Sequence, residues 1–327
     1  MRDDLFSRVV VLPDKERQVM MDIIRGKSIP PLYMDAVAKK VFNPDVHPNR
    51  MNYLLRSIAK DESIDVSCSA ANEGMKMSIQ SKGLITDIAS WLRDGRLTDL
   101  EIQKIRQDYI FTRLELYASQ MLLIQYSVEV QQAKGELNFG NLKDVLIVVL
   151  MVESPAVFKE HDKENDHYIH RHMKEMADTG ISYLPKAKKV YVQLDKCLAQ
   201  FKEGRNAEAK DGKPDELQLW LAMIADVNDE QVSLAAENSK ELQDIRKEAF
   251  LMGQDKDVLL MVLNEEFARM DWATDMAMSE ERGWNKGGSD FAALIRKLRS
   301  LGRGDDAERA IEDDDYRTAL YKEFNLA

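Results

Sequence analysis

The segment DVLIVVLMV at residues 144–152 constrains the fold most, because it is almost continuously apolar and rich in β-branched side chains. A run of this length and composition predicts a strand that is buried on both faces, as in sheets covered by helices on each side. The segment KKVYVQLDK at residues 188–196 predicts a further strand. The chain is therefore expected to contain an α/β core.

The neighbouring segments fit such a core. Apolar side chains recur at helical spacing before and after a pair of short strand-like runs. The expected order is a helix over 34–60, strands near 84–92 and 97–104, a helix over 105–133, and strands near 144–152 and 188–195. This order predicts a mixed sheet of about four strands with helices on both sides.

The character of the chain changes after about residue 213, where three successive segments are helical by period and by composition. The Gly-rich stretch GWNKGG at 283–288 is expected to break the helical pattern, with two short helices after it. We therefore expect a lead-in over 1–30, an α/β domain over 31–210, a helical region over 211–282 and a helical tail over 283–327.

The composition limits the classes of function. The net charge of −11 argues against a protein that coats nucleic acid by bulk charge, but charges of both signs nearly balance within residues 31–130. A local phosphate-binding surface is therefore compatible with this middle part. The sequence has no apolar run of about 18 residues and no signal-peptide pattern, and its two cysteines make no disulfide framework. These features predict a cytoplasmic protein without a membrane partner.

The stretch TDIASWLRDGRLTDLEIQK at 86–104 places carboxylates on both sides of a tight turn. A two-residue loop would send Asp87 and Glu101 to opposite faces of the hairpin, because side chains alternate along a strand. A three-residue loop over 93–95, with Gly95 in the left-handed conformation, would instead place Asp87 opposite Glu101 and Gln103 diagonally across. We favour the three-residue loop because its glycine falls at the required position.

Two carboxylates on directly facing strand positions repel each other unless something neutralises them. A divalent cation such as Mg²⁺ does so, since it prefers carboxylate, carbonyl and water oxygens. Alternatively, Asp87 and Glu101 are solvated on an exposed sheet face, or the loop has even length and they never meet. Spacing alone leaves these alternatives open.

Four of the five histidines fall in the polar segment HDKENDHYIHRH, at His161, His167, His170 and His172. Imidazoles at this density could ligate a metal ion. However, their spacing matches no zinc pattern, and no cysteine lies nearby in the sequence. We interpret the segment as a polar connector that precedes a strand.

Several segments, taken in order, resemble the PD-(D/E)XK nuclease superfamily and, more closely, its recombination-promoting nuclease or PD-(D/E)XK family transposase branch. The segment IPPLYMDAVAKKVF resembles the opening motif, with Asp35, Lys39 and Phe42 at matching positions and Ala38 replacing an aromatic residue. The segment GLITDIASWLRDGRLTDLEIQ resembles the hairpin motif of the family, and TRLELYASQM resembles the helix that follows it.

Later segments extend the resemblance over most of the chain. They include the helical region around Trp220 and the stretch ending in SEERG. KKVYVQLDKC resembles a later strand of the family, where Glu-Leu-Pro-Lys is usual and this chain has Gln193-Leu194-Asp195-Lys196. The resemblance implies a restriction-endonuclease-like core with a mixed sheet flanked by helices, assigned to residues 31–210, followed by a C-terminal helical region.

The resemblance also implies a metal-dependent DNA endonuclease with Mg²⁺ or Mn²⁺ as cofactor. Carried over to this sequence, Asp87 and Glu101 are the metal ligands, helped by the carbonyl of Ile102. Gln103 falls where the wider superfamily has a lysine and where this family commonly has glutamine. A glutamine can orient the attacking water but carries no charge to it. Lys104 is expected on the other face of the strand and is not expected to substitute.

Three further residues receive supporting roles from the resemblance. Asp35 is either an outer ligand of the metal or a residue that positions its own helix. Arg113 and Lys39 are candidates for contacts with a flanking phosphate. Both could equally be ordinary surface charges on helices.

Two functions follow from these expectations. The first is a metal-dependent DNA endonuclease associated with recombination or mobile elements. The retention of Asp87, Glu101 and Gln103 favours this function. The second is a catalytically inactive module of the same fold that binds DNA or assembles with proteins. The acidic composition and the absence of a lysine at position 103 favour this alternative. DNA is the expected partner, and a second copy of the chain is a further candidate.

Overall fold

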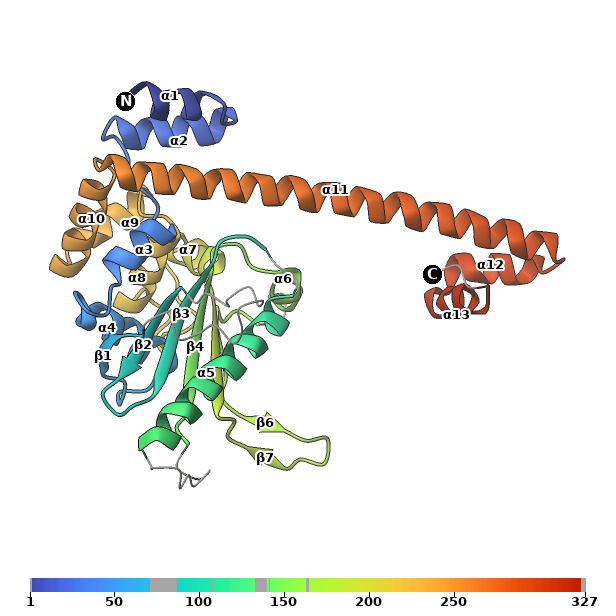
Figure 1. The fold of residues 1–327 in the computed structure, drawn as a ribbon, viewed down its shortest axis with the longest axis horizontal. Coiled ribbons are helices and arrows are strands. Elements are labelled where there is room, and N and C mark those ends of the chain that lie inside the picture. Colours follow the sequence, from blue (N-terminus) through green and yellow to red (C-terminus); the bar gives the residue numbers. More distant parts are fainter. Residues whose placement is uncertain are drawn as a thin grey trace. The chain divides into compact units, whose positions relative to one another are not determined.

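The computed structural model describes residues 2–70, 87–106, 109–132, 140, 142–162 and 165–324. The chain divides into two compact units, residues 1–265 and 266–327. Figure 1 shows the ribbon of both units. Residues 84–86, where the first hairpin strand was expected to begin, lie outside the described residues.

The first unit contains most of the secondary structure. Its helices are α1 (Arg2–Val10), α2 (Asp14–Ile24), α3 (Asp35–Val41), α4 (Pro48–Ala59), α5 (Ile110–Gln132), α6 (Ala156–His161), α7 (Leu194–Lys202), α8 (Glu216–Ala225), α9 (Glu230–Ala236) and α10 (Lys240–Met252). Its strands are β1 (Val66–Ser69), β2 (Ile88–Leu92), β3 (Leu97–Gln103), β4 (Val145–Met151), β5 (Ile169–His172), β6 (Glu175–Met176), β7 (Ser182–Tyr183) and β8 (Ala187–Gln193).

Within the described residues, the main sheet has six strands in the order β1-β2-β3-β4-β8-β5. β3, β4 and β8 run parallel to one another, whereas β1, β2 and β5 pair antiparallel with their neighbours. The sheet is therefore mixed, as the sequence predicted. β6 and β7, which follow β5 and precede β8 in the chain, form a separate two-stranded ribbon that projects from the sheet (Figure 1).

The central strands are buried along their whole length, which explains the continuous apolar sequence of β4. One face of the sheet packs against α5 (Figure 1), and the apolar cluster between them includes Ala89, Leu114 and Tyr191. α4 and α7 also contact β4. Because alternate β4 side chains lie in the α5 cluster and the others are equally buried, helices cover both faces of the sheet.

The two predicted strands near 144–152 and 188–195 are confirmed as β4 and β8, and the predicted mixed sheet gains β1 and β5 at its edges. The interpretation of 161–172 wholly as a connector was wrong, because Ile169–His172 form strand β5. The sequence concealed this strand because an edge strand pairs on one side only and tolerates polar residues.

The expected single helix over 34–60 was also wrong, since the structure has two helices, α3 and α4. Pro44 stands in the interval between them, and Pro48 opens α4 at a position that needs no N–H. The lead-in, to which the sequence analysis assigned no secondary structure, contains α1 and α2. α5 begins at Ile110, a few residues later than expected.

All elements after residue 213 are helical in the described residues, as predicted. The expected break at 283–288 was wrong, because helix α11 (Lys256–Ser300) runs through it. Each glycine weakens a helix by only about 1 kcal/mol, and the stretch contains no proline, so helix-forming flanks can carry it. None of the helices in the described part of the chain is long and apolar enough to cross a membrane.

The second unit comprises the later part of α11 with α12 (Gly304–Glu312) and α13 (Asp314–Phe324). These helices enclose a small apolar core of Leu294, Leu298, Ala310 and Leu320. The chain turns between α11 and α12 at Gly302, which has a φ of 71°.

The β2–β3 hairpin has the predicted three-residue loop. The N–H of Leu92 donates to the carbonyl of Arg96 at 2.8 Å, and the N–H of Gly95 donates to the carbonyl of Leu92 at 2.9 Å. Gly95 has a φ of 83°, in the left-handed region that L side chains rarely adopt. The pairing of Ile88 with Leu100 then fixes the register that continues to Asp87 and Glu101.

This turn yields a test of the register. We expect Gly95→Ala to lower the free energy of unfolding by about 1 kcal/mol, because alanine resists the left-handed conformation. An added Cβ would also meet Lys143 Nζ at 2.5 Å, although that flexible side chain can move. Urea denaturation would measure the change. Gly95→Asn is the matched control, since asparagine tolerates this conformation, and equal stability of both variants would contradict the assigned turn.

Candidate active site

The structure brings Asp87 and Glu101 together on the sheet face that α5 covers. Asp87 directly precedes β2, and the hairpin register places it opposite Glu101. The N–H of Ile102 donates to Asp87 Oδ2 at 2.7 Å, which ties the carboxylate to β3. Asp87 is partly buried, and Glu101 is 2% exposed. The predicted geometry of facing carboxylates is confirmed, and the alternative of a solvated pair is excluded for Glu101.

Arg113 joins Glu101 and Gln103 into one network. Its guanidinium donates to Glu101 Oε1 at 2.5 Å, to Gln103 Oε1 at 3.2 Å and to the hydroxyl of Tyr117 at 2.9 Å. Gln103 Nε2 in turn donates to the carbonyl of Ile105 at 2.7 Å. The arginine that the sequence offered as a phosphate contact therefore lies at the buried carboxylate, on the first turns of α5.

Asp99 is a member of this site that the sequence reasoning missed. It lies two residues before Glu101 on β3, pairs with Ala89 and is fully buried on the same face. Neither of its carboxylate oxygens, nor Glu101 Oε2, has a hydrogen-bond partner among the described residues. The signal was available, because strand alternation from Glu101 places Asp99 and Gln103 beside it.

Burial and mutual repulsion perturb all three acids. Burial, followed by the charge of Asp87, raises the pKa of Asp99 to about 8. Burial, followed by the charges of Asp87 and Asp99, raises the pKa of Glu101 well above its ordinary value, although Arg113 opposes this rise. Burial also raises the pKa of Asp87. The site is thus short of positive charge for three ionised carboxylates.

A second polar cluster surrounds Asp35 at the start of α3. Lys104 Nζ contacts Asp35 Oδ1 at 2.5 Å and also pairs with Glu265, whose carboxylate accepts from the N–H of Asp35 at 3.0 and 3.1 Å. Lys39 Nζ lies 3.8 Å from Asp35 Oδ2. The charge of Asp35 raises the pKa of Asp87, whereas Lys39 and Lys104 lower it, so this cluster is an electrostatic neighbour of the facing carboxylates.

The donor set can be compared with the needs of a divalent cation. In the segments that the structure describes, no group of three or more His, Cys, Asp or Glu side chains is arranged to hold a metal ion. However, Asp99 and Glu101 present three buried carboxylate oxygens on one sheet face that have no hydrogen-bond partner in the described part of the chain. Buried carboxylates of this kind are stabilised by a hard cation, so the residues present fit Mg²⁺ or Mn²⁺ in chemistry.

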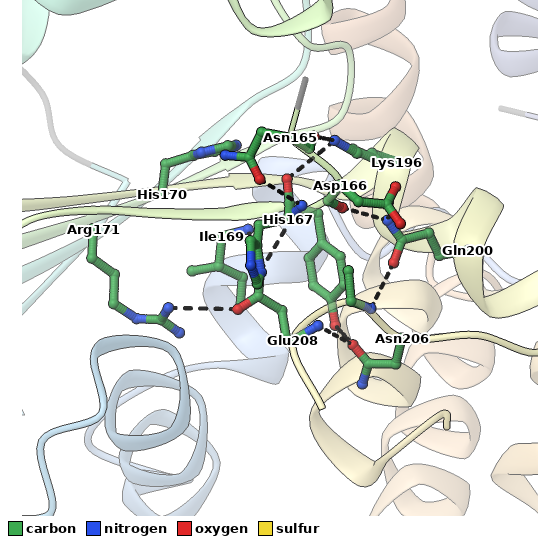
Figure 2. A network of polar contacts seen from close by, with 12 residues as sticks. Asn165, Asp166, His167, Ile169, His170, Arg171, Lys196, Gln200, Asn206 and Glu208 are labelled. Atoms are coloured by element: carbon green, nitrogen blue, oxygen red, sulfur yellow. Dashed lines mark hydrogen bonds and ion pairs between the residues drawn. The ribbon is translucent and has the colours of Figure 1, made fainter. Parts of the chain in front are cut away.

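The histidine-rich segment is held by a different polar network (Figure 2). Glu208 accepts from the N–H groups of Tyr168 and Ile169 and contacts His167 Nδ1 at 3.1 Å. Lys196 Nζ donates to the carbonyls of Asn165 and His167. These contacts fix the start of β5 against the loop that follows α7.

Residues 193–196, where this chain differs from the usual Glu-Leu-Pro-Lys of the resembling family, make structural contacts in this region. Gln193 is fully buried, and its side-chain oxygen lies 2.8 Å from His170 Nε2. Asp195 accepts from the hydroxyl and the N–H of Ser154 at 2.5 and 3.1 Å. The polar residues after β8 therefore anchor the chain between β4 and β5.

A mixed sheet covered by helices, with carboxylates facing each other across a hairpin and a polar residue two positions after the second carboxylate, defines a PD-(D/E)XK nuclease fold. The family model for PD-(D/E)XK nuclease family transposases matches residues 32–279, about three quarters of the chain. The chain belongs to this family, which connects it with nucleases related to mobile elements. No curated protein and no solved structure matches the chain significantly.

The raised pKa of Asp99 predicts how stability depends on pH without divalent cations. Between the ordinary pKa of 3.8 and about 8, the folded protein holds a proton that the unfolded chain releases, so the free energy of unfolding should fall as pH rises. Asp99→Asn removes this titrating group, so the free energy of unfolding of the variant should fall less steeply with pH than that of the unaltered protein. Urea denaturation with a chelator at several pH values would measure both slopes, and parallel slopes would contradict the raised pKa.

Proposed function

We propose that the protein is a Mg²⁺- or Mn²⁺-dependent DNA endonuclease that acts in recombination or on mobile elements. The observation that carries the proposal is the pair of buried acids on β3, Asp99 and Glu101. Among the described residues, three of their four carboxylate oxygens lack a hydrogen-bond partner, and burial opposes their charge. A purely structural hairpin gains nothing from this arrangement, because unpartnered buried carboxylates destabilise the fold. Membership of the nuclease family supports DNA as the substrate.

In this proposal Asp87 and Glu101 hold the cation, the carbonyl of Ile102 assists, and Asp99 adds a carboxylate from the same face. When bound, the cation lowers the pKa of a water and offsets charge on the phosphate. The 2.7 Å bond from the Ile102 N–H fixes the orientation of Asp87 before any ligand arrives. Preorganised ligands of this kind lower the cost of assembling the site.

Gln103 and Arg113 then position the reactants. Gln103 is a neutral hydrogen-bonding group beside Glu101 and can align the attacking water. Arg113 pairs with Glu101, and its planar guanidinium could also pair with a phosphate if Glu101 held a cation. Lys39, with 41% of its side chain exposed, is available to a flanking phosphate, while Asp35 positions Lys39 and Lys104.

The second candidate is an inactive module of the same fold that binds DNA or assembles with proteins. The ion pair between Arg113 and Glu101 favours it, because an arginine that already neutralises the carboxylate can replace a metal structurally. The uncharged Gln103 in place of lysine points in the same direction. Cation binding separates the two candidates, since a purely structural site does not require it.

Removal of single carboxylates tests the nuclease directly. With Mg²⁺ present, we expect the protein to cleave plasmid DNA and Glu101→Gln or Asp87→Asn to slow cleavage by about 100-fold or more, because each loses a charged ligand. Asp94→Asn is the matched control, since it removes a carboxylate from the loop of the same hairpin. Cleavage at the unaltered rate by both site variants would place the chemistry elsewhere.

Calorimetric titration with Mg²⁺ and Mn²⁺ separates ligands from positioning residues. We expect Glu101→Gln to lose measurable cation binding, whereas Gln103→Ala should retain affinity and cleave on the order of 100-fold more slowly, because only the water is misplaced. If the unaltered protein binds neither cation and cleaves no DNA, the inactive module is the correct function.

A further inference from the structure

A cavity of about 440 Å³ opens at the edge of the sheet face that carries the acids. Its lining residues are Phe111, Val157, Phe158, His161, His170, Arg171, His172 and Tyr191. Phe111 at the start of α5 is 39% exposed, whereas Phe158 and Tyr191 are buried beneath it. The three aromatic rings contact one another, with centroid distances of 5.4, 5.6 and 5.7 Å.

The cavity is aligned with the candidate active site by the sheet register. Glu101 on β3 pairs with Val149 on β4, which pairs with Tyr191 on β8, which pairs with His170 on β5. All four side chains therefore lie in one row on the same face. Two strand spacings separate Glu101 from Tyr191, a distance of about 10 Å and the length of roughly three stacked base steps.

Three of the eight side chains that line the cavity are histidines, whose imidazoles donate and accept hydrogen bonds. His161, His170 and His172 bring imidazoles to an aromatic surface, and the ring of His170 lies 5.3 Å from that of Phe158. Arg171 leaves β5 on the side opposite to His170 (Figure 2). There its guanidinium is held by the carbonyl of Ile58 and by Glu208.

We propose that this cavity binds a nucleobase of the DNA strand, turned out of the base stack close to the position of cleavage. The rings of Phe111, Phe158 and Tyr191 offer the apolar surface on which a base stacks. The imidazoles of His161 and His172 can bond to its polar edge or to the adjoining phosphate. This inference rests on the proposed function, because DNA is its ligand. It adds that the substrate is single-stranded or locally unpaired beside the scissile bond.

Both the location and the chemistry of the cavity favour an unpaired nucleobase as its ligand. An aromatic pocket alone could receive many apolar groups, but this pocket continues the row of the acids across the same sheet face. Because only about 10 Å separates Glu101 from Tyr191, a strand whose scissile phosphate is held at the acids reaches the cavity within a few nucleotides. Paired bases present only their edges to a protein, so stacking on Phe111 requires a base that has left the duplex.

Binding without cleavage tests the cavity. With a chelator present, fluorescence anisotropy would compare a labelled thymidine oligonucleotide of about 16 nucleotides with an abasic strand of equal length. We expect the unaltered protein to bind the thymidine strand more tightly. Phe111→Ala should weaken binding of that strand by between about 5-fold and 100-fold, the range for the loss of one stacked base, and should leave abasic binding unchanged.

Two further variants make the result decisive. Phe111→Leu keeps an apolar side chain against Phe158 and Tyr191 but removes the ring, so it should lose the same preference without loss of folding. Leu116→Ala is the matched control, because Leu116 is exposed on α5 away from the cavity lining. The proposal is overturned if the unaltered protein binds both strands equally, or if Phe111→Leu binds the thymidine strand as tightly as the unaltered protein.

The outcome is independent of nuclease activity. If cleavage depends on Glu101 but Phe111→Leu has no effect on strand binding, the proposed nucleobase site is wrong, whereas the proposed nuclease function still holds. A base preference that depends on Phe111, in a protein that never cleaves DNA, would support the cavity and assign it to the inactive DNA-binding module.

Discussion

The burial of three carboxylates on one sheet face is the constraint on which the rest of the site depends. Asp99 and Glu101 lie under α5, where water cannot screen their repulsion from Asp87. Arg113 offsets part of this charge from the first turns of α5, and the N–H of Ile102 holds Asp87. The unsatisfied remainder is the physical reason to infer a cation there, because a stable fold rarely leaves such groups without partners.

The same sheet face links the acids to the aromatic cavity. The strand register fixes both on one row, so neither can shift along the sheet without the other. The polar network around Glu208 and Lys196 holds β5 in place and thereby keeps His170 beside Tyr191 (Figure 2). The proposed binding and cleavage of an unpaired strand requires a fixed spacing, and a rigid sheet supplies it more accurately than a loop.

The sequence predicted the elements whose local signal is strong. The apolar run of β4, the helical region after residue 213 and the glycine turn of the hairpin were all predictable, because burial on both faces, helical periodicity and a left-handed glycine each leave a local pattern. The edge strand β5 and the continuous path of α11 through 283–288 were not. Their conformations come from pairing and from neighbouring turns, and those outweigh the preferences of single residues.

The sequence by itself reduced the hairpin to two registers and favoured the one in which Asp87 faces Glu101, because Gly95 falls where a three-residue loop needs a left-handed residue. Only the tertiary structure decided their surroundings. It buried Asp99 beside them, placed Arg113 against Glu101 and brought His170 into line with Tyr191. Register is a property of neighbouring residues in one segment, whereas burial and charge balance depend on helices and strands that are distant along the chain.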